Sequence, residues 1–96
     1  MANCFPSDKE LLILNLLRDE PSGLYGLELV AESNGALKRG TVYVTLTRME
    51  DKGFIKSRLP KKAAHAGLPR PHYTIAAPGL RCLEAAQLMK MPMVRA

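Results

Sequence analysis

The sequence has no tryptophan, and phenylalanine and tyrosine together make up only 5% of its 96 residues. Its hydrophobic core must therefore be mostly aliphatic, and a chain of this length is expected to form a single domain over residues 1–96. No apolar run approaches the ~20 residues that a transmembrane helix needs, and the N-terminus lacks the features of a signal peptide. We therefore expect a soluble cytoplasmic protein that does not enter a membrane.

The sequence also lacks the groupings of side chains that catalysis or metal binding requires. Its two cysteines, Cys4 and Cys82, lie far apart without metal-type spacing, so we expect thiols that are either buried or at the surface. Its two histidines, His65 and His72, are not accompanied by a cluster of carboxylates that could act as acids or bases. We expect no enzymatic activity, no metal site and no cofactor.

Charge is distributed unevenly along the chain. Residues 1–37 contain two basic and six acidic side chains, whereas residues 38–72 contain nine basic and two acidic ones. The net charge of the whole chain is +5. A concentrated basic segment suits a polyanion such as nucleic acid, because binding releases counterions from the phosphates. Taken alone, the excess of charge fits a solvated surface equally well.

The hydrophobic pattern predicts an α+β fold that is mostly α. Ser7 and Glu10 form a capping box at the start of a strongly apolar first helix. A loop rich in Pro, Gly and Lys at residues 60–69 separates two segments of strand-like alternation, which predicts a two-stranded wing. This order of elements predicts a winged helix-turn-helix: three helices, the wing and a C-terminal helix. The expected bounds are helices at about 7–19, 23–34 and 39–52, a wing at about 54–76, and a last helix at about 78–90.

The third predicted helix carries side chains that fit DNA recognition. Val42, Leu46 and Met49 form its inner stripe, which turns hydroxyl, aliphatic and cationic side chains outward. Such side chains can contact base edges in a major groove, although any solvated helix face can have a similar composition. Lys38 and Arg39 lie at the N-terminal end of this predicted helix, where backbone donors also favour phosphate. The outward residues are Thr41, Val44, Thr45, Arg48 and Lys52.

The predicted wing is also basic. Lys61, Lys62, His65 and Arg70 lie in or beside its tip, next to the proposed reading helix. Lysine side chains on a loop suit phosphate or minor-groove contacts better than the reading of bases. Two independent basic features in the order of a winged helix favour duplex DNA binding over an incidental charged surface.

Three stretches resemble the PadR-like family of transcriptional regulators. Residues 40–55 (GTVYVTLTRMEDKGFI) match its third-helix motif, commonly Gly-x-aliphatic-Tyr-Pro-x-Leu-x-Arg-Leu/Met-Glu-x-x-Gly-aromatic/Leu-Ile. Residues 11–29 (LLILNLLRDEPSGLYGLEL) resemble its first helix, turn and second-helix start, and residues 70–85 (RPHYTIAAPGLRCLEA) resemble its second wing strand and following helix. The sequence departs from the family pattern at Val44, where proline is common, and at Ala77, where threonine is often found.

The resemblance implies a dimeric repressor that binds a short palindromic operator in double-stranded DNA, associated with the nucleoid and encoded by a bacterium, phage or plasmid. It also implies that Thr41 and Tyr43 approach the DNA backbone. A phenolic or drug-like effector acts on some members, but the long C-terminal dimerisation helices of many members are absent before the last residue, Ala96, so sensing of an effector stays open. The predicted DNA-binding residues are Lys38, Arg39, Thr41, Tyr43, Val44, Thr45, Arg48, Lys52, Lys61, Lys62 and Arg70.

Surplus apolar surface predicts where a second copy docks. The first and last helices carry more apolar surface than a three-helix core can cover. The predicted homodimer interface is Leu12, Leu16, Leu80, Leu83, Ala86 and Met89. Two alternative functions stay open: a winged-helix module for plasmid or phage replication, partition or control, and a protein–protein interaction domain. Duplex binding that weakens steeply with salt would separate DNA binding from the interaction domain.

Overall fold

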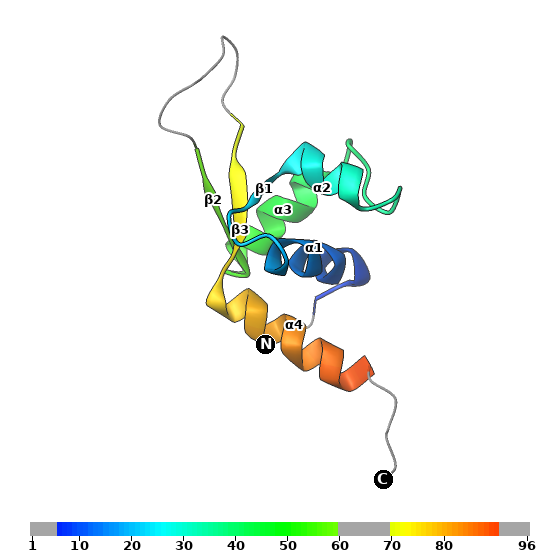
Figure 1. Cartoon of the computed structure of the whole chain (residues 1–96), viewed down its shortest axis with the longest axis vertical. Helices are drawn as coiled ribbons and strands as arrows, with labels where there is room; N and C mark the ends of the chain where they lie inside the picture. Colours follow the sequence, from blue (N-terminus) through cyan, green and yellow to red (C-terminus); the bar gives the residue numbers. More distant parts are fainter. Residues whose placement is uncertain (1–5, 60–69, 91–96) are drawn as a thin grey trace.

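Four helices and three short strands follow one another in the residues that the structure, a computed structural model, describes, namely 6–59 and 70–90. Figure 1 shows α1 at the centre, with α2 and α3 on one side of it, α4 on the other, and β2 and β3 extending away from the helices. This is the predicted winged-helix arrangement. The elements are α1 (Asp8–Arg18), β1 (Leu24–Tyr25), α2 (Gly26–Glu32), α3 (Val42–Asp51), β2 (Ile55–Arg58), β3 (His72–Ile75) and α4 (Ala77–Lys90).

The capping box predicted at the start of α1 is confirmed. The backbone N–H of Ser7 donates to Glu10 Oε1 at 2.9 Å, and the backbone N–H of Glu10 donates to Ser7 Oγ at 3.3 Å. Two backbone donors that have no partner within the helix are thereby satisfied. The helix ends at Arg18, whose positive charge is favourable near the carbonyl end of a helix.

The main correction to the predicted fold is a third strand, β1. The sequence predicts residues 24 and 25 as part of the second helix, because the apolar residues there have helical spacing. In the structure Leu24 pairs with Tyr73 and Tyr25 pairs with His72, in an antiparallel ladder with β3. The sheet order is β1-β3-β2, and α2 begins only after β1. A strand this short is stabilised by its distant partner rather than by its own sequence, so tertiary pairing overrides local spacing.

α3 begins later than predicted. The backbone N–H groups of Thr41 and Val42 both donate to the carbonyl of Lys38, at 3.1 and 2.9 Å. Residues 38–41 therefore form a turn, and regular helix starts at Val42. Lys38 and Arg39 both precede the helix, whereas Arg39 was predicted as its first residue.

The end of α3 follows the prediction. Gly53 has a φ of 83°, a left-handed conformation that glycine adopts without steric cost. Its N–H donates to the carbonyl of Glu50, and the N–H of Phe54 donates to the carbonyl of Met49, both at 2.9 Å. These two bonds close the helix C-terminus and direct the chain into β2.

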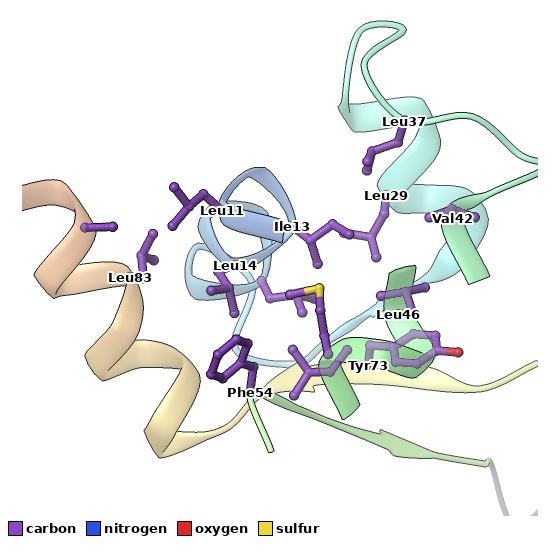
Figure 2. Packing of buried hydrophobic residues seen from close by; sticks show 14 residues of the cluster. Leu11, Ile13, Leu14, Leu29, Leu37, Val42, Leu46, Phe54, Tyr73 and Leu83 are labelled. Atoms are coloured by element: carbon purple, nitrogen blue, oxygen red, sulfur yellow. The ribbon is translucent and has the colours of Figure 1, made fainter. Parts of the chain in front are cut away.

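The core is mostly aliphatic, as predicted, and it lies between the four helices and the sheet (Figure 2). Phe54 and Tyr73 are its aromatic members among the described residues. Replacing one of the fully covered leucines with alanine is expected to cost about 2–5 kcal/mol of stability. The largest fully covered side chains are Ile13, Leu14, Leu17, Leu29, Leu46, Met49, Ile55, Leu83 and Val42. The predicted inner stripe of α3 is thus confirmed.

α4 packs along α1 and against the start of β2. A Cβ at Gly79 would overlap the backbone carbonyl of Phe54, so glycine is what allows the first turn of α4 to approach so closely. Further along the helix, Gln87 Nε2 donates to Asn15 Oδ1 at 3.1 Å, and Arg18 Nη1 donates to Gln87 Oε1 at 3.1 Å. Within the described ranges, no helix is both long and apolar enough to cross a bilayer.

Candidate nucleic-acid interface

The outward face of α3 presents a shallow hollow that is open to solvent. Tyr43, Val44, Thr47 and Arg48 line it. Tyr43 and Val44 are 39% and 56% exposed, although both are large and largely apolar. Val44, Thr47 and Arg48 have the spacing that places side chains on one helix face. Methyl groups, a phenol and a guanidinium in one hollow can meet thymine methyls, phosphates and guanine edges of a major groove.

Two of the predicted contacts lie beside this hollow. Thr41 is exposed and immediately precedes α3. Thr45 is half-buried, and its hydroxyl donates to the carbonyl of Thr41 at 3.3 Å. Because that hydroxyl is bonded to its own helix, Thr45 offers mainly its methyl group to a ligand.

Lys52, which was predicted to contact DNA, has a partner within the protein. Its Nζ lies 3.2 Å from Glu10 Oε2 and 5.6 Å from the centre of the Phe54 ring. Glu10 is only 5% exposed, so its carboxylate would be costly to leave without a cation. The structure therefore places Lys52 as the partner of a buried carboxylate on α1. Sequence spacing along one helix does not reveal a partner on another helix.

Lys38 and Arg39 are exposed in the turn before α3. Because the carbonyl of Lys38 already accepts the N–H groups of Thr41 and Val42, those two donors are not available to a phosphate. The N–H groups of Tyr43 and Val44, the second and third residues of α3, are not part of this turn, so the expected phosphate site at the N-terminal end of the helix stays a prediction. The charges of the two exposed side chains can also attract a phosphate.

Only part of the predicted basic wing lies in the described residues. Arg70 is exposed just before β3. Lys61, Lys62 and His65 lie outside the described residues, and the predicted role of the two lysines therefore stays a prediction.

Three further exposed side chains, on α3 and β2, were not predicted as DNA contacts. Thr47 lines the hollow, and Lys56 and Arg58 are exposed on β2. Ser57, between the two cations, donates its hydroxyl to Glu50 Oε2 of α3 at 2.6 Å, so Lys56 and Arg58 lie on the opposite face of the strand. Two patterns in the sequence indicate these residues. Thr47 follows Val44 by three positions, which is helical spacing, and Lys56 and Arg58 are two positions apart, which is strand spacing.

Tyr73 of β3 lies behind α3 as a neutral, buried phenol. Burial raises its pKa above the ordinary value of 10.0, and the Glu50 carboxylate and the phenol of Tyr43 raise it further. In the described residues, no three His, Cys, Asp or Glu side chains come together to hold a metal ion. Cys82 is half-buried on α4, and Cys4 lies outside the described residues.

The predicted dimer residues separate into three groups by their exposure. Leu83 and Ala86 are 0% and 1% exposed within the protomer's own core, so the prediction that they contact a second copy is wrong. Met89 is 72% exposed and its neighbour Leu88, which was not predicted, is 70% exposed. The half-buried members are Leu12, Leu16 and Leu80.

The chain is similar to PadR family transcriptional regulators of known structure. The profile of the PadR-like family of transcriptional regulators matches residues 13–85. A crystal structure of a PadR family transcription regulator from Clostridium difficile is 31% identical, with a TM-score of 0.72 over 86% of each chain. A PadR-like regulator from Bacillus cereus is 28% identical, with a TM-score of 0.63 over 83% of this chain and 78% of that one.

A third similar structure, Bacillus subtilis PadR in complex with operator DNA, is 22% identical with a TM-score of 0.74. The match covers 91% of this chain and 50% of that one. No curated protein matches the sequence. The described fold is thus a winged helix-turn-helix. This chain belongs to the PadR-like family of transcriptional regulators.

Proposed function

We propose that the chain binds double-stranded DNA as a homodimer and represses transcription from a palindromic operator. The observation that carries this proposal is the outward face of α3, where large apolar side chains and Arg48 share a solvent-open hollow. Membership of a family of transcriptional regulators supports it. So does the fold shared with Bacillus subtilis PadR, whose structure contains operator DNA.

Within this proposal, α3 enters the major groove. Arg48 reads a guanine edge, and Val44 and Thr47 contact thymine methyls beside it. Thr41 and Tyr43 contact the DNA backbone, as the family resemblance implies. Thr45 contributes through its methyl group, because its hydroxyl bonds to the helix.

Basic residues outside α3 would position the protein without reading sequence. Lys38 and Arg39 attract phosphates from the turn before α3, where both are exposed. On the predicted wing, Arg70 would do so together with Lys61 and Lys62. Neutralised phosphates release counterions, so these residues set the dependence of affinity on salt. Lys52 is left out of this set because it pairs with Glu10.

A second copy would dock on α1 and the end of α4. Leu88 and Met89 expose apolar surface there. Leu12 and Leu16 lie on the same side of α1 as Asn15, which accepts the hydrogen bond from Gln87 of α4. A palindromic operator needs two reading helices about one DNA turn apart, which a symmetric dimer supplies.

The dimer is tested by light scattering on the whole chain. Charges introduced by Leu88→Glu with Met89→Glu should convert a dimer to a monomer, because they would be buried without partners. Ala77→Glu, an exposed position at the other end of the same helix, is the matched control and should stay dimeric. A monomeric wild-type protein at micromolar concentration would remove the dimer from the proposal.

DNA binding is tested by selecting bound duplexes from a random pool and measuring affinity for the enriched site. We expect two inverted half-sites about 10 base pairs apart, centre to centre. Arg48→Ala should weaken binding to the selected site by about 1–3 kcal/mol and reduce preference at one base pair. If the wild-type protein binds no duplex even at low salt, the interaction-domain alternative is favoured.

A further inference from the structure

Gly26 and Tyr43 form a close contact between the two helices of the helix-turn-helix. Gly26 is the buried first residue of α2, and Tyr43 is the second residue of α3. A Cβ added to Gly26 would lie 2.6 Å from Tyr43 Cε1, 2.7 Å from Cζ and 2.8 Å from the hydroxyl oxygen. The hydroxyl end of the ring therefore rests on the Gly26 Cα, in the space that any other side chain would fill.

Backbone conformation does not require glycine at this position. The glycines with positive φ in the described residues are Gly23, Gly35 and Gly53, and Gly26 is not among them. Alanine is also preferred to glycine in helices. The remaining physical reason for glycine at Gly26 is the room that it leaves for the ring of Tyr43.

The seated ring forms one wall of the hollow on α3. Tyr43 lines that hollow together with Arg48 and is 39% exposed, so one part of the ring rests on α2 while another part faces solvent. A ring held in this way loses little further conformational freedom when its hydroxyl binds a ligand. The position of the hydroxyl relative to Arg48 is then set by the contact with Gly26.

We propose that Gly26 is a positioning residue for DNA binding: it seats the ring of Tyr43 so that the phenol hydroxyl is presented to a backbone phosphate. This inference rests on the DNA-binding function proposed above. It adds a residue that does not itself touch DNA and acts through Tyr43.

Gly26→Ala tests the contact between Gly26 and the Tyr43 ring without removing any group proposed to contact DNA. The atoms in the way belong to the far end of a partly exposed side chain, so the ring can swing outward and the fold should persist. We expect an unchanged or slightly higher midpoint of urea unfolding. We also expect an affinity for the selected duplex about three- to tenfold weaker, the range of one lost hydrogen bond. The slope of log affinity against log salt should not change, because tyrosine neutralises no phosphate.

A double-mutant cycle shows whether Gly26 acts through Tyr43. Tyr43→Ala should weaken binding, and adding Gly26→Ala to it should have no further effect because no ring is left to displace. In the wild-type protein, an NMR cross-peak between Gly26 Hα and the Tyr43 ring protons should be present, and Gly26→Ala should move the ring resonances of Tyr43 the most. This second readout does not depend on DNA.

The outcomes separate this inference from the function on which it rests. If Gly26→Ala leaves DNA affinity unchanged, the positioning role of Gly26 is overturned and the proposed function is not. The same conclusion follows if Gly26→Ala still weakens binding in the Tyr43→Ala background. A wild-type protein that binds no duplex overturns the proposed function, and the DNA role of Gly26 with it. Absence of the Gly26–Tyr43 cross-peak overturns the contact itself.

Discussion

The ammonium of Lys52 lies 3.2 Å from the carboxylate of Glu10, which joins the C-terminal end of α3 to the first turn of α1. Glu10 Oε1 also accepts the N–H of Ser7, so a single buried carboxylate caps α1 and binds the C-terminal end of α3. The side chain of Lys52 is 39% exposed, and water screens the pair on that side. A cation at the C-terminal end of α3 thus serves the fold.

Substitutions at Glu10 should separate these two roles. Glu10→Ala removes both the cap and the ion pair and should lower the free energy of unfolding by about 2 kcal/mol. Glu10→Gln keeps an acceptor for the Ser7 N–H and should cost about 1 kcal/mol. Urea denaturation measures both. Equal losses for the two variants would show that the charge, and not the cap, carries the effect.

Lys52→Met should affect stability and leave the electrostatics of DNA binding unchanged. Methionine keeps an apolar stem near Phe54 but leaves the Glu10 carboxylate without its cation. We expect a lower unfolding midpoint and the wild-type slope of log affinity against log salt. A slope reduced by about one unit would instead place Lys52 on a phosphate, as its position in the sequence suggests.

Gly79→Ala should be among the most damaging small substitutions in the chain. The added methyl would meet the backbone carbonyl of Phe54, which cannot move without disturbing β2. We expect a loss of stability of about 1–3 kcal/mol or more. Gly40→Ala is the matched control, because a Cβ there meets nothing within 4 Å and should leave the unfolding midpoint near that of the wild type.

Lys56→Ala combined with Arg58→Ala tests whether β2 extends the DNA-binding surface. Both side chains are exposed on the outer face of the wing strand. If both contact phosphates, the salt slope should fall by about two units, and selected and unselected duplexes should weaken alike. Lys9→Ala, an exposed cation on α1, is the control and should keep the wild-type slope. An unchanged slope in the double variant would remove β2 from the interface.

Alkaline pH should destabilise the fold through Tyr73. Its folded-state pKa is raised above the ordinary value of 10.0, first by burial and then by Glu50 and Tyr43. The neutral phenol's contribution to stability is therefore fully present below 10.0 and is lost as the pH rises through the folded-state pKa. Tyr73→Phe should lose less stability than the wild type between pH 9 and about 11 when unfolding is followed by circular dichroism. If the wild type and Tyr73→Phe lost the same stability over this pH range, Tyr73 would not be the group that causes the loss.

Local sequence signals were enough for much of the fold. The capping box at Ser7 and the glycine stop at Gly53 depend on a few neighbouring residues, and the structure has both. The buried stripe of α3 was predictable from the sequence because helical periodicity indicates which side of the helix faces the core. The strand β1 could not be predicted from local sequence, because it pairs with β3, which lies far along the chain.

The candidate site was predictable only in part, for the same reason. The helix and its exposed Arg48 follow from periodicity and from the family motif. The pairing of Lys52 with Glu10, and the burial of Leu83 and Ala86, depend on how separate helices pack against each other. The contact of Gly26 with Tyr43 likewise arises only when α2 and α3 are brought together.

The central claim is that α3 meets duplex DNA through its outward hollow. The most direct test is to follow the backbone amide resonances of the whole chain while the selected duplex is added. The account predicts the largest shifts at Tyr43, Val44, Thr47 and Arg48, with smaller ones at Lys56 and Arg58. Shifts confined to α1 and α4, with α3 unchanged, would contradict it.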